Sequence, residues 1–322
     1  MKLSNFFIAL ITVICLAVSL SYGLKPDKEY MATPSDYGII YEEATIQTRD
    51  NLIIKGWFFP AQDTHGIANE IVGKLVPVPK ELKSKPRDYA VKYGERRPTI
   101  VICDGDAGNM TFSIFYGYHF FTNGYNVLTF DWRGFGHSSE WPIEQDYLCY
   151  KEFIIDYDAA IDFLKQRPEV DTTKIGVLGF STGAYLSFAI AAKRDDIAAY
   201  AGRALMSSFK DLISVLKKVD PSRTWKTPKN YPKGLIPINA AKDMKKPVFL
   251  VVGEKDVRTP PWMSEKIMKK LKGEKELWIV PGAEHGGQNG PELYNYPEFF
   301  MRVISFFNKY LMISPSPERL EK

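Results

Sequence analysis

Apolar residues along this chain gather in short continuous runs, and longer segments with helical spacing lie between them. The runs are Arg97–Asp104, Asn126–Phe130, Lys174–Leu178, Ala201–Met206, Val248–Gly253 and Leu277–Val280. The helix-like segments are 111–123, 150–167, 184–193, 261–271 and 299–310. An unbroken apolar run is typical of a parallel strand that is covered on both faces. The alternation of strands and helices therefore predicts right-handed βαβ units and an α/β fold on a parallel sheet.

The first hundred residues follow a different pattern. Glu43–Thr48 alternates polar and apolar residues, and Leu52–Phe59 returns after a turn, so a β-hairpin is predicted. Residues 24–41 show no periodicity and are interpreted as an irregular tether. Residues 61–97 form a long polar insertion with three prolines, to which the sequence assigns no role.

Residues 1–23 have the layout of a signal peptide. Lys2 is followed by an apolar core, Phe6–Leu20, and then by small residues. We therefore expect an exported protein: periplasmic, secreted, or held at a membrane and facing outward. Because no charged residue occurs between Lys2 and Lys25, an uncleaved membrane anchor stays open beside a cleaved leader. A lipoprotein is a third option, weakened by the position of Cys15 inside the apolar core.

Charge and cysteine content add little to this picture. The net charge of +4 is small and the lysines are scattered, so no nucleic-acid partner is expected. With the leader removed, Cys103 and Cys149 remain, and an oxidising compartment would allow them to pair. Cys103 lies in a buried run, however, which favours packing as a small apolar side chain.

The sequence Gly179-Phe180-Ser181-Thr182-Gly183 follows an apolar run and precedes a helix-like segment. This context identifies G-x-S-x-G as a nucleophile elbow, a turn so sharp that the serine at its apex is strained and its hydroxyl exposed. The two glycines leave room for the helix to approach the strand. Ser181 is therefore the predicted nucleophile.

A serine hydroxyl needs a base within hydrogen-bond reach, and that base needs an orienting acid. The order along the chain in such enzymes is serine, acid, histidine. His285 is the only one of the four histidines that follows Ser181, and it lies after the last predicted strand. Asp256, three residues past Val248–Gly253, is the predicted acid, with Glu254 as the second choice.

With these residues in place, the chain resembles a serine hydrolase of the alpha/beta hydrolase superfamily. The group in question has an oxyanion loop H-G-N-x-G-N and a following strand that ends in F-D-Y-R-G-F-G-x-S. Here the two stretches read D-G-D-A-G-N at 104–109 and F-D-W-R-G-F-G-H-S at 130–138. The resemblance covers about residues 43–310 and implies a mostly parallel eight-stranded sheet flanked by helices. It places the oxyanion donors at the backbone N–H groups of Asp106 and Thr182.

Two aspartates depart from the family pattern. Asp104 stands where the family has histidine, and Asp106 where it has asparagine. Backbone donors survive a change of side chain, so the oxyanion hole can still form. A carboxylate at about 6 Å, at an effective dielectric of about 20, would nevertheless cost on the order of 3 kcal/mol, or about a hundredfold in rate. Either Asp106 points away, or one carboxylate is protonated, or catalysis is slow.

These observations give a single hydrolase domain at 42–322 with a small cap at 207–246. The first functional hypothesis is hydrolysis of a small carboxylic ester through an acyl-enzyme, with no metal or organic cofactor. Trp225, Tyr231 and Leu235 in the cap favour a modest, partly apolar acyl or alcohol group, but the aromatic residues are equally suited to packing in the core. An exported serine peptidase stays open, as does a weakly active or inactive binding protein on the same fold. A dehalogenase or epoxide hydrolase is excluded, because it requires a carboxylate where Ser181 stands.

Overall fold

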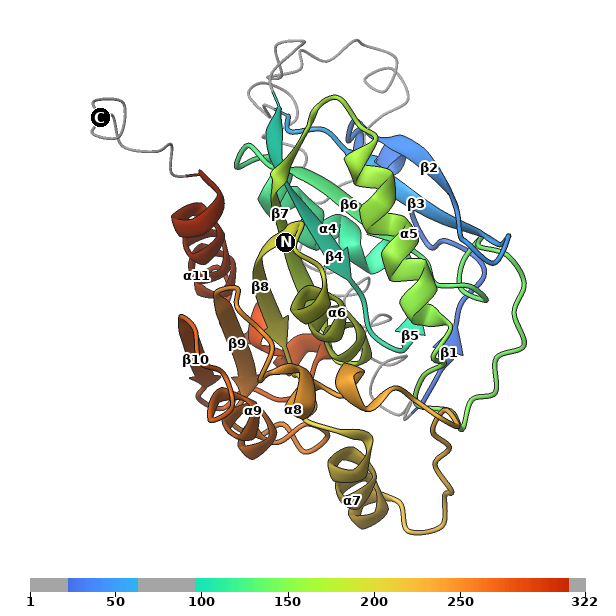
Figure 1. The fold of residues 1–322 in the computed structure, drawn as a ribbon, viewed down its shortest axis with the longest axis vertical. Coiled ribbons are helices and arrows are strands. Elements are labelled where there is room, and N and C mark those ends of the chain that lie inside the picture. Colours follow the sequence, from blue (N-terminus) through green and yellow to red (C-terminus); the bar gives the residue numbers. More distant parts are fainter. Residues whose placement is uncertain (1–22, 63–95, 313–322) are drawn as a thin grey trace, which may run out of the picture.

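Eight strands pair into one sheet in the order β10-β9-β8-β7-β4-β6-β3-β2 (Figure 1). The computed structural model describes residues 23–62 and 96–312. Its strands in this sheet are β2 (Glu42–Gln47), β3 (Ile53–Phe59), β4 (Arg97–Cys103), β6 (Asn126–Phe130), β7 (Val170–Phe180), β8 (Ile197–Arg203), β9 (Val248–Gly253) and β10 (Lys275–Val280). The six strands from β10 to β6 are parallel, whereas β3 is antiparallel to both β6 and β2. The predicted mostly parallel, eight-stranded sheet is thereby confirmed.

Helices cover both faces of the sheet (Figure 1). They are α4 (Ser113–Phe121), α5 (Phe153–Lys165), α6 (Thr182–Lys193), α7 (Phe209–Val219), α8 (Pro237–Ala240), α9 (Pro261–Met268), α10 (Pro291–Tyr294) and α11 (Glu298–Phe307). One apolar core joins a face of the sheet to α5, α6 and α9. A second core joins the opposite face to α4 and α11. This three-layer arrangement brings the carboxyl ends of the parallel strands to a common edge, where ligands of such sheets bind.

One predicted strand is displaced. The sequence run Ala201–Met206 suggested a strand, but β8 begins at Ile197 and ends at Arg203. Ala204 has a φ of 56°, a left-handed backbone conformation that cannot continue a strand. The strand therefore ends with the arginine side chain at the edge where the parallel strands terminate.

The segment 24–41 is not a free tether. Leu24 is fully buried, and β1 (Lys25–Pro26) pairs in parallel with β5 (Ala107–Gly108). The N–H groups of Lys25 and Asp27 donate to the carbonyls of Asp106 and Gly108, at 2.7 and 2.9 Å. We call residues 24–41 the strap. Its position has a physical cause, because it satisfies backbone groups of the loop after β4 that the main sheet leaves open.

The segment predicted as a cap, 207–246, contains α7, α8 and a 3-10 turn, Lys233–Leu235. Its aromatic residues pack inward, and the ring of Tyr231 lies 5.9 Å from Tyr185 on α6 and 5.5 Å from Phe209 on α7. Trp225 is also buried. The sequence left a pocket and a packing role open for these side chains, and the structure places them in or against the apolar core beside α6.

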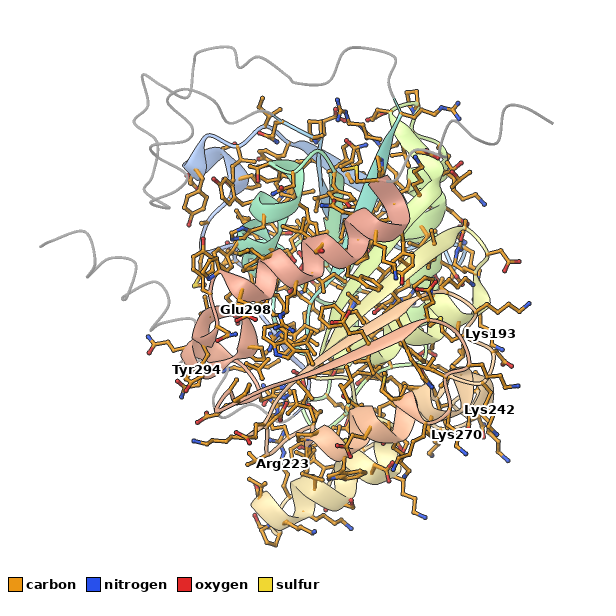
Figure 2. All side chains as sticks on the ribbon, turned by 90° about the vertical axis from the view of Figure 1, so that its left-hand side faces the viewer. Lys193, Arg223, Lys242, Lys270, Tyr294 and Glu298 are labelled. Carbon is orange, nitrogen blue, oxygen red and sulfur yellow. The ribbon has the colours of Figure 1, made fainter. Side chains whose placement is uncertain are left out.

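Side chains distribute unevenly over the surface. Figure 2 shows Lys193, Lys242 and Lys270 together on one side of the molecule and Tyr294 and Glu298 on the other.

Cys103 and Cys149 are both buried free thiols, as expected for packing residues. Within 23–62 and 96–312, no helix is both long and apolar enough to cross a bilayer. The expected signal peptide and nearly all of the insertion at 61–97 lie outside these residues.

Candidate active site

The elbow forms where β7 turns into α6. Ser181 has φ 51° and ψ −117°, a strained conformation for a residue with a side chain, and it precedes the first residue of α6. A Cβ at Gly179 would lie 2.5 Å from Ser187 Oγ, and one at Gly183 would lie 2.0 Å from the carbonyl oxygen of Asp104. Both glycines are therefore required by close backbone packing, as the sequence predicts.

The structure brings Ser181, His285 and Asp256 into one line of hydrogen bonds. His285 Nε2 lies 3.1 Å from Ser181 Oγ, and His285 Nδ1 lies 2.8 Å from Asp256 Oδ2. The three residues come from the turn after β7, the loop after β10 and the loop after β9. Glu254, the second choice for the acid, instead accepts a hydrogen bond from the N–H of Gly282.

Hydrogen bonds hold Asp256 as an ion. Its carboxylate accepts from the N–H groups of Arg258 and Thr259, at 2.9 and 2.8 Å, and from the Thr259 hydroxyl, at 2.7 Å. Burial acts to raise the pKa of Asp256, but His285 and these donors outweigh burial and lower the pKa to about 2. Burial lowers the pKa of His285 below its ordinary value of 6.5, against the opposing charge of Asp256. At neutral pH the pair is therefore a carboxylate beside a neutral imidazole, the form that a general base requires.

The two unexpected aspartates of the loop after β4 have separate partners. The Asp106 carboxylate lies 3.4 Å from the Arg258 guanidinium. Asp104 accepts a hydrogen bond from the hydroxyl of Ser113 on α4. Burial raises the pKa of Asp104 to about 6, although Ser113 and the charge of Arg203 oppose it. Pairing with Arg258 therefore offsets the charge of Asp106, whereas Asp104, with a pKa of about 6, is still mostly ionised at neutral pH.

The strap supports this loop from behind. Besides its backbone bonds to Asp106 and Gly108, it supplies the carbonyls of Asp27 and Glu29, which accept from Asn109 Nδ2 at 3.2 and 2.8 Å. Asn109 Oδ1 also accepts from the N–H of Thr111 at the start of a 3-10 turn, Met110–Phe112. The asparagine of the D-G-D-A-G-N sequence thus joins the loop to the strap.

The second family stretch, at 130–138, is structural. Asp131 accepts from the N–H of Met110 and from the hydroxyl of Tyr30 on the strap, both at 2.7 Å. Arg133 is fully buried and donates to Asp50 and Asp156. Neither Asp131 nor Arg133 forms a hydrogen bond with the Ser181 hydroxyl among the described contacts. The stretch instead fastens the hairpin, α5 and the strap to the oxyanion loop.

A cavity of about 160 Å³ lies beside His285 and the loop after β4. Its apolar wall comes from α4, including Ile114 and Phe115, and from Leu293 on α10. The strap contributes Met31, Ala32 and Tyr37. No residue of 207–246 borders the cavity. The prediction that this segment shapes the pocket is therefore wrong, and the reason is that its aromatic residues are committed to the core beside α6.

Sequence reasoning missed the polar wall of the cavity, formed by Arg203, Glu292, Arg258 and Tyr116. Arg203 Nη1 donates to the backbone carbonyl of His285 at 2.6 Å, and the N–H of Ser181 donates to the carbonyl of Arg203 at 3.0 Å. One local signal existed, since Arg203 interrupts the apolar run Ala201–Met206. Glu292 and Tyr116 carry no such signal. Within the described residues, no group of three or more His, Cys, Asp and Glu could hold a metal ion.

Comparisons with known proteins bear on the fold and the family of the chain. The chain is 25% identical over 251 residues to an uncharacterised protein of Mycobacterium tuberculosis, covering 78% of this chain and 73% of that one. It superposes on an esterase from Pyrococcus furiosus with a TM-score of 0.63 and 20% identity, over 89% of this chain and 100% of the esterase. An acylaminoacyl peptidase from Pyrococcus horikoshii superposes with a TM-score of 0.59 and 19% identity, over 88% of this chain and 44% of the peptidase.

The superposed structures establish the alpha/beta hydrolase fold. A model of one family within that fold, the prolyl oligopeptidase family, matches residues 111–313. This stretch contains Ser181, Asp256 and His285, and it begins just after the loop that carries Asp106. The chain therefore belongs to the prolyl oligopeptidase family and is a serine hydrolase.

Proposed function

We propose that this protein hydrolyses carboxylic esters through an acyl-enzyme formed on Ser181. The observation that carries the proposal is the line of hydrogen bonds from Ser181 Oγ through His285 to the ionised Asp256, beside a small cavity with an apolar wall. No other contact of Ser181 Oγ competes with the one to His285 among the described residues. The serine is thus placed for activation by a neutral base.

Each residue has a defined part in the proposed reaction. His285 removes the proton of Ser181 as Oγ attacks the ester carbonyl, and Asp256 stabilises the imidazolium that results. The backbone N–H groups of Asp106 and Thr182 donate to the oxyanion. Thr182 is the first residue of α6, so its N–H has no partner within the helix. His285 then gives its proton to the leaving alcohol, and a water molecule activated by His285 releases the acid.

The side-chain environment supports an oxyanion at this place. Asp106 is paired with Arg258, so its charge is offset, and the pKa of Asp104 is raised to about 6 by burial. The Arg203 guanidinium lies on the same wall of the cavity. Arg258 pairs with Asp106, and the charge of Arg203 acts on Asp104. A cation therefore lies near each of the two aspartates that depart from the family pattern.

A serine peptidase is the second candidate, and membership of the prolyl oligopeptidase family favours it. Peptide amides need the same nucleophile and base, but a peptide substrate extends on both sides of the bond that is cut. The described walls of the cavity, with the strap on one side and α10 on another, enclose about 160 Å³, which favours a compact group. We therefore place ester hydrolysis first and peptide hydrolysis second.

The proposal is tested with the full chain and Ser181→Ala. The substrates are p-nitrophenyl esters from acetate to decanoate, with acetyl-alanine p-nitroanilide as the amide substrate, and a fluorophosphonate probe reports on the serine. We expect ester hydrolysis and probe labelling in the natural protein and neither in Ser181→Ala. Hydrolysis of the anilide with no hydrolysis of esters would favour the peptidase. A folded protein that neither labels nor hydrolyses would favour a binding protein.

A further inference from the structure

At the polar end of the cavity, Arg203 and Glu292 each have a side-chain atom without a hydrogen-bond partner among the described residues. Arg203, at the carboxyl end of β8, is 2% exposed. Its Nη1 donates to the carbonyl of His285, and its Nη2 pairs with Glu292 Oε1 at 3.1 Å and donates to the hydroxyl of Tyr116 at 3.3 Å. The guanidinium also lies 3.5 Å over the ring of Phe180. Arg203 is thereby fixed by contacts on several sides.

Glu292 is the less satisfied member of the pair. It is 6% exposed and lines the cavity from α10. Its Oε1 is engaged by Arg203, but Oε2 has no hydrogen-bond partner among the residues that the structure describes. A buried carboxylate oxygen without a donor costs free energy, typically more than a neutral group in the same position. A ligand that occupies the cavity can remove this cost by donating a hydrogen bond.

The surroundings narrow the chemistry of that donor. A carboxylate only accepts, so the ligand group must carry an O–H or N–H. Arg203 already offsets the charge of Glu292, and a second cation at Oε2 would lie close to the guanidinium and be repelled by it. The remainder of the wall is apolar, with Ile114, Phe115 and Leu293. The structure therefore suits an apolar chain that ends in a neutral hydrogen-bond donor.

We propose that Glu292, held by Arg203, is a specificity subsite for esters whose acyl or alcohol chain carries a neutral donor such as a hydroxyl group. This inference rests on the proposed ester hydrolysis and adds the class of substrate. The subsite adjoins the reacting groups, because Arg203 contacts the backbone of both Ser181 and His285. The donor group of the substrate binds Glu292 Oε2 while its ester carbonyl faces Ser181.

The test uses the full chain and esters with four matched chain ends. p-Nitrophenyl esters of hexanoic and octanoic acid carry at the chain end either hydrogen, hydroxyl, methoxy or ammonium. A second set places the same groups at the end of the alcohol chain of an acetate ester. At the better chain length of one set, we expect kcat/KM for the hydroxyl ester to exceed that for the methoxy ester about tenfold. The ammonium ester should fall below the hydroxyl ester.

Glu292→Gln and a matched control separate specificity from structure. Glu292→Gln should abolish the preference for hydroxyl over methoxy. Glu298→Gln, an equivalent change at an exposed position on α11 (Figure 2), should keep it. A Glu292→Gln protein that loses rate equally on every ester would reduce Glu292 to a positioning residue for Arg203 and overturn the subsite.

The remaining outcomes separate failure of the subsite from failure of the proposed function. Equal rates for all chain ends in both sets, or a preference for ammonium, would overturn the neutral-donor subsite while ester hydrolysis stands. If no ester is hydrolysed and the fluorophosphonate probe leaves Ser181 unlabelled, the proposed function fails and the subsite fails with it. Hydrolysis of the unsubstituted esters therefore distinguishes the two failures.

Discussion

Two buried arginines, Arg133 and Arg203, differ in how completely their guanidinium nitrogens are hydrogen-bonded. The Arg133 guanidinium binds two carboxylates, and each of its three nitrogens donates to Asp50 or Asp156 at 2.6–3.2 Å. Arg203 has one carboxylate partner, Glu292, and its Nε has no partner among the described residues. Arg133 does not border the cavity beside His285, whereas Arg203 lines it.

The difference shows how a buried ion pair can be assigned a part in the molecule. A cluster in which every nitrogen of the guanidinium donates to a carboxylate, such as that of Arg133, holds chain segments together. A cluster with open donors and acceptors, facing a cavity, carries an energetic cost that only a ligand or a solvent molecule can remove. The functional role proposed for Arg203 and Glu292 therefore rests on incomplete hydrogen bonding at the border of a cavity, and not on burial alone.

The largest expected effect is on stability. In Arg133→Leu, Asp156 and Asp50 lose their counter-ion, and we expect the free energy of unfolding in urea to fall by about 3–5 kcal/mol. Arg49→Leu is the control, because Arg49 is exposed and its pair with Asp158 is expected to contribute about 0–1 kcal/mol. Equal losses in the two variants would contradict the structural interpretation of Arg133.

The second prediction concerns activity. In Arg203→Met, the carbonyl of His285 loses its charged donor, so the base is held less firmly and kcat should fall about 10–100-fold. KM for an unsubstituted ester should change less than kcat, since the apolar wall is intact. Arg203→Lys should recover part of kcat, because lysine keeps one donor. A fall in stability with kcat unchanged would place Arg203 in the same class as Arg133.

The third prediction concerns the strap. Tyr30→Phe removes the donor to Asp131 Oδ2 but keeps the ring that lies 5.0 Å from Trp57. We expect the free energy of unfolding to fall by about 1–2 kcal/mol, because a buried carboxylate loses one of its two donors. Tyr310→Phe is the control, because the Tyr310 hydroxyl donates to the exposed Glu274. This change should alter the free energy of unfolding by less than about 0.5 kcal/mol. If the two variants behave alike, the strap does not depend on Asp131.

The smallest expected effect is in the pH profile of kcat/KM. His285 is active as a base only when it is neutral, and burial lowers its pKa below 6.5. The rate should therefore rise as pH rises through a midpoint below 6.5. Asp104, whose pKa is about 6, titrates in the same range, so Asp104→Asn is measured in parallel. A midpoint above 6.5 in both proteins would contradict a buried, neutral His285.

Much of the fold was predictable because parallel strands and their helices carry local patterns. Asn126–Phe130 and Val248–Gly253 were predicted with the bounds that the structure has. The displaced strand β8 shows the limit of this reasoning. The run from 197 to 206 is apolar except for Arg203, and only the left-handed Ala204 reveals where the strand stops.

The prediction assigned the wall of the cavity to the segment 207–246, but the strap forms part of it. The strap, expected to be a tether, forms a wall of the cavity through Met31, Ala32 and Tyr37, whereas 207–246, expected to be a cap, packs beside α6. Neither outcome has a local signal. An irregular segment packs wherever it can satisfy backbone groups, and aromatic residues are equally suited to a pocket and to a core.

The sequence by itself determined the elbow at Ser181 and its association with His285 and Asp256. Steric crowding at the turn requires glycine at fixed spacing, and the order of the three residues along the chain leaves one histidine available. Only the tertiary structure decided the polar wall made by Arg203 and Glu292 and the pairing of Asp106 with Arg258. Those contacts join residues far apart in the chain, and their energy depends on burial and on distances of about 3 Å, which no spacing of residue types encodes.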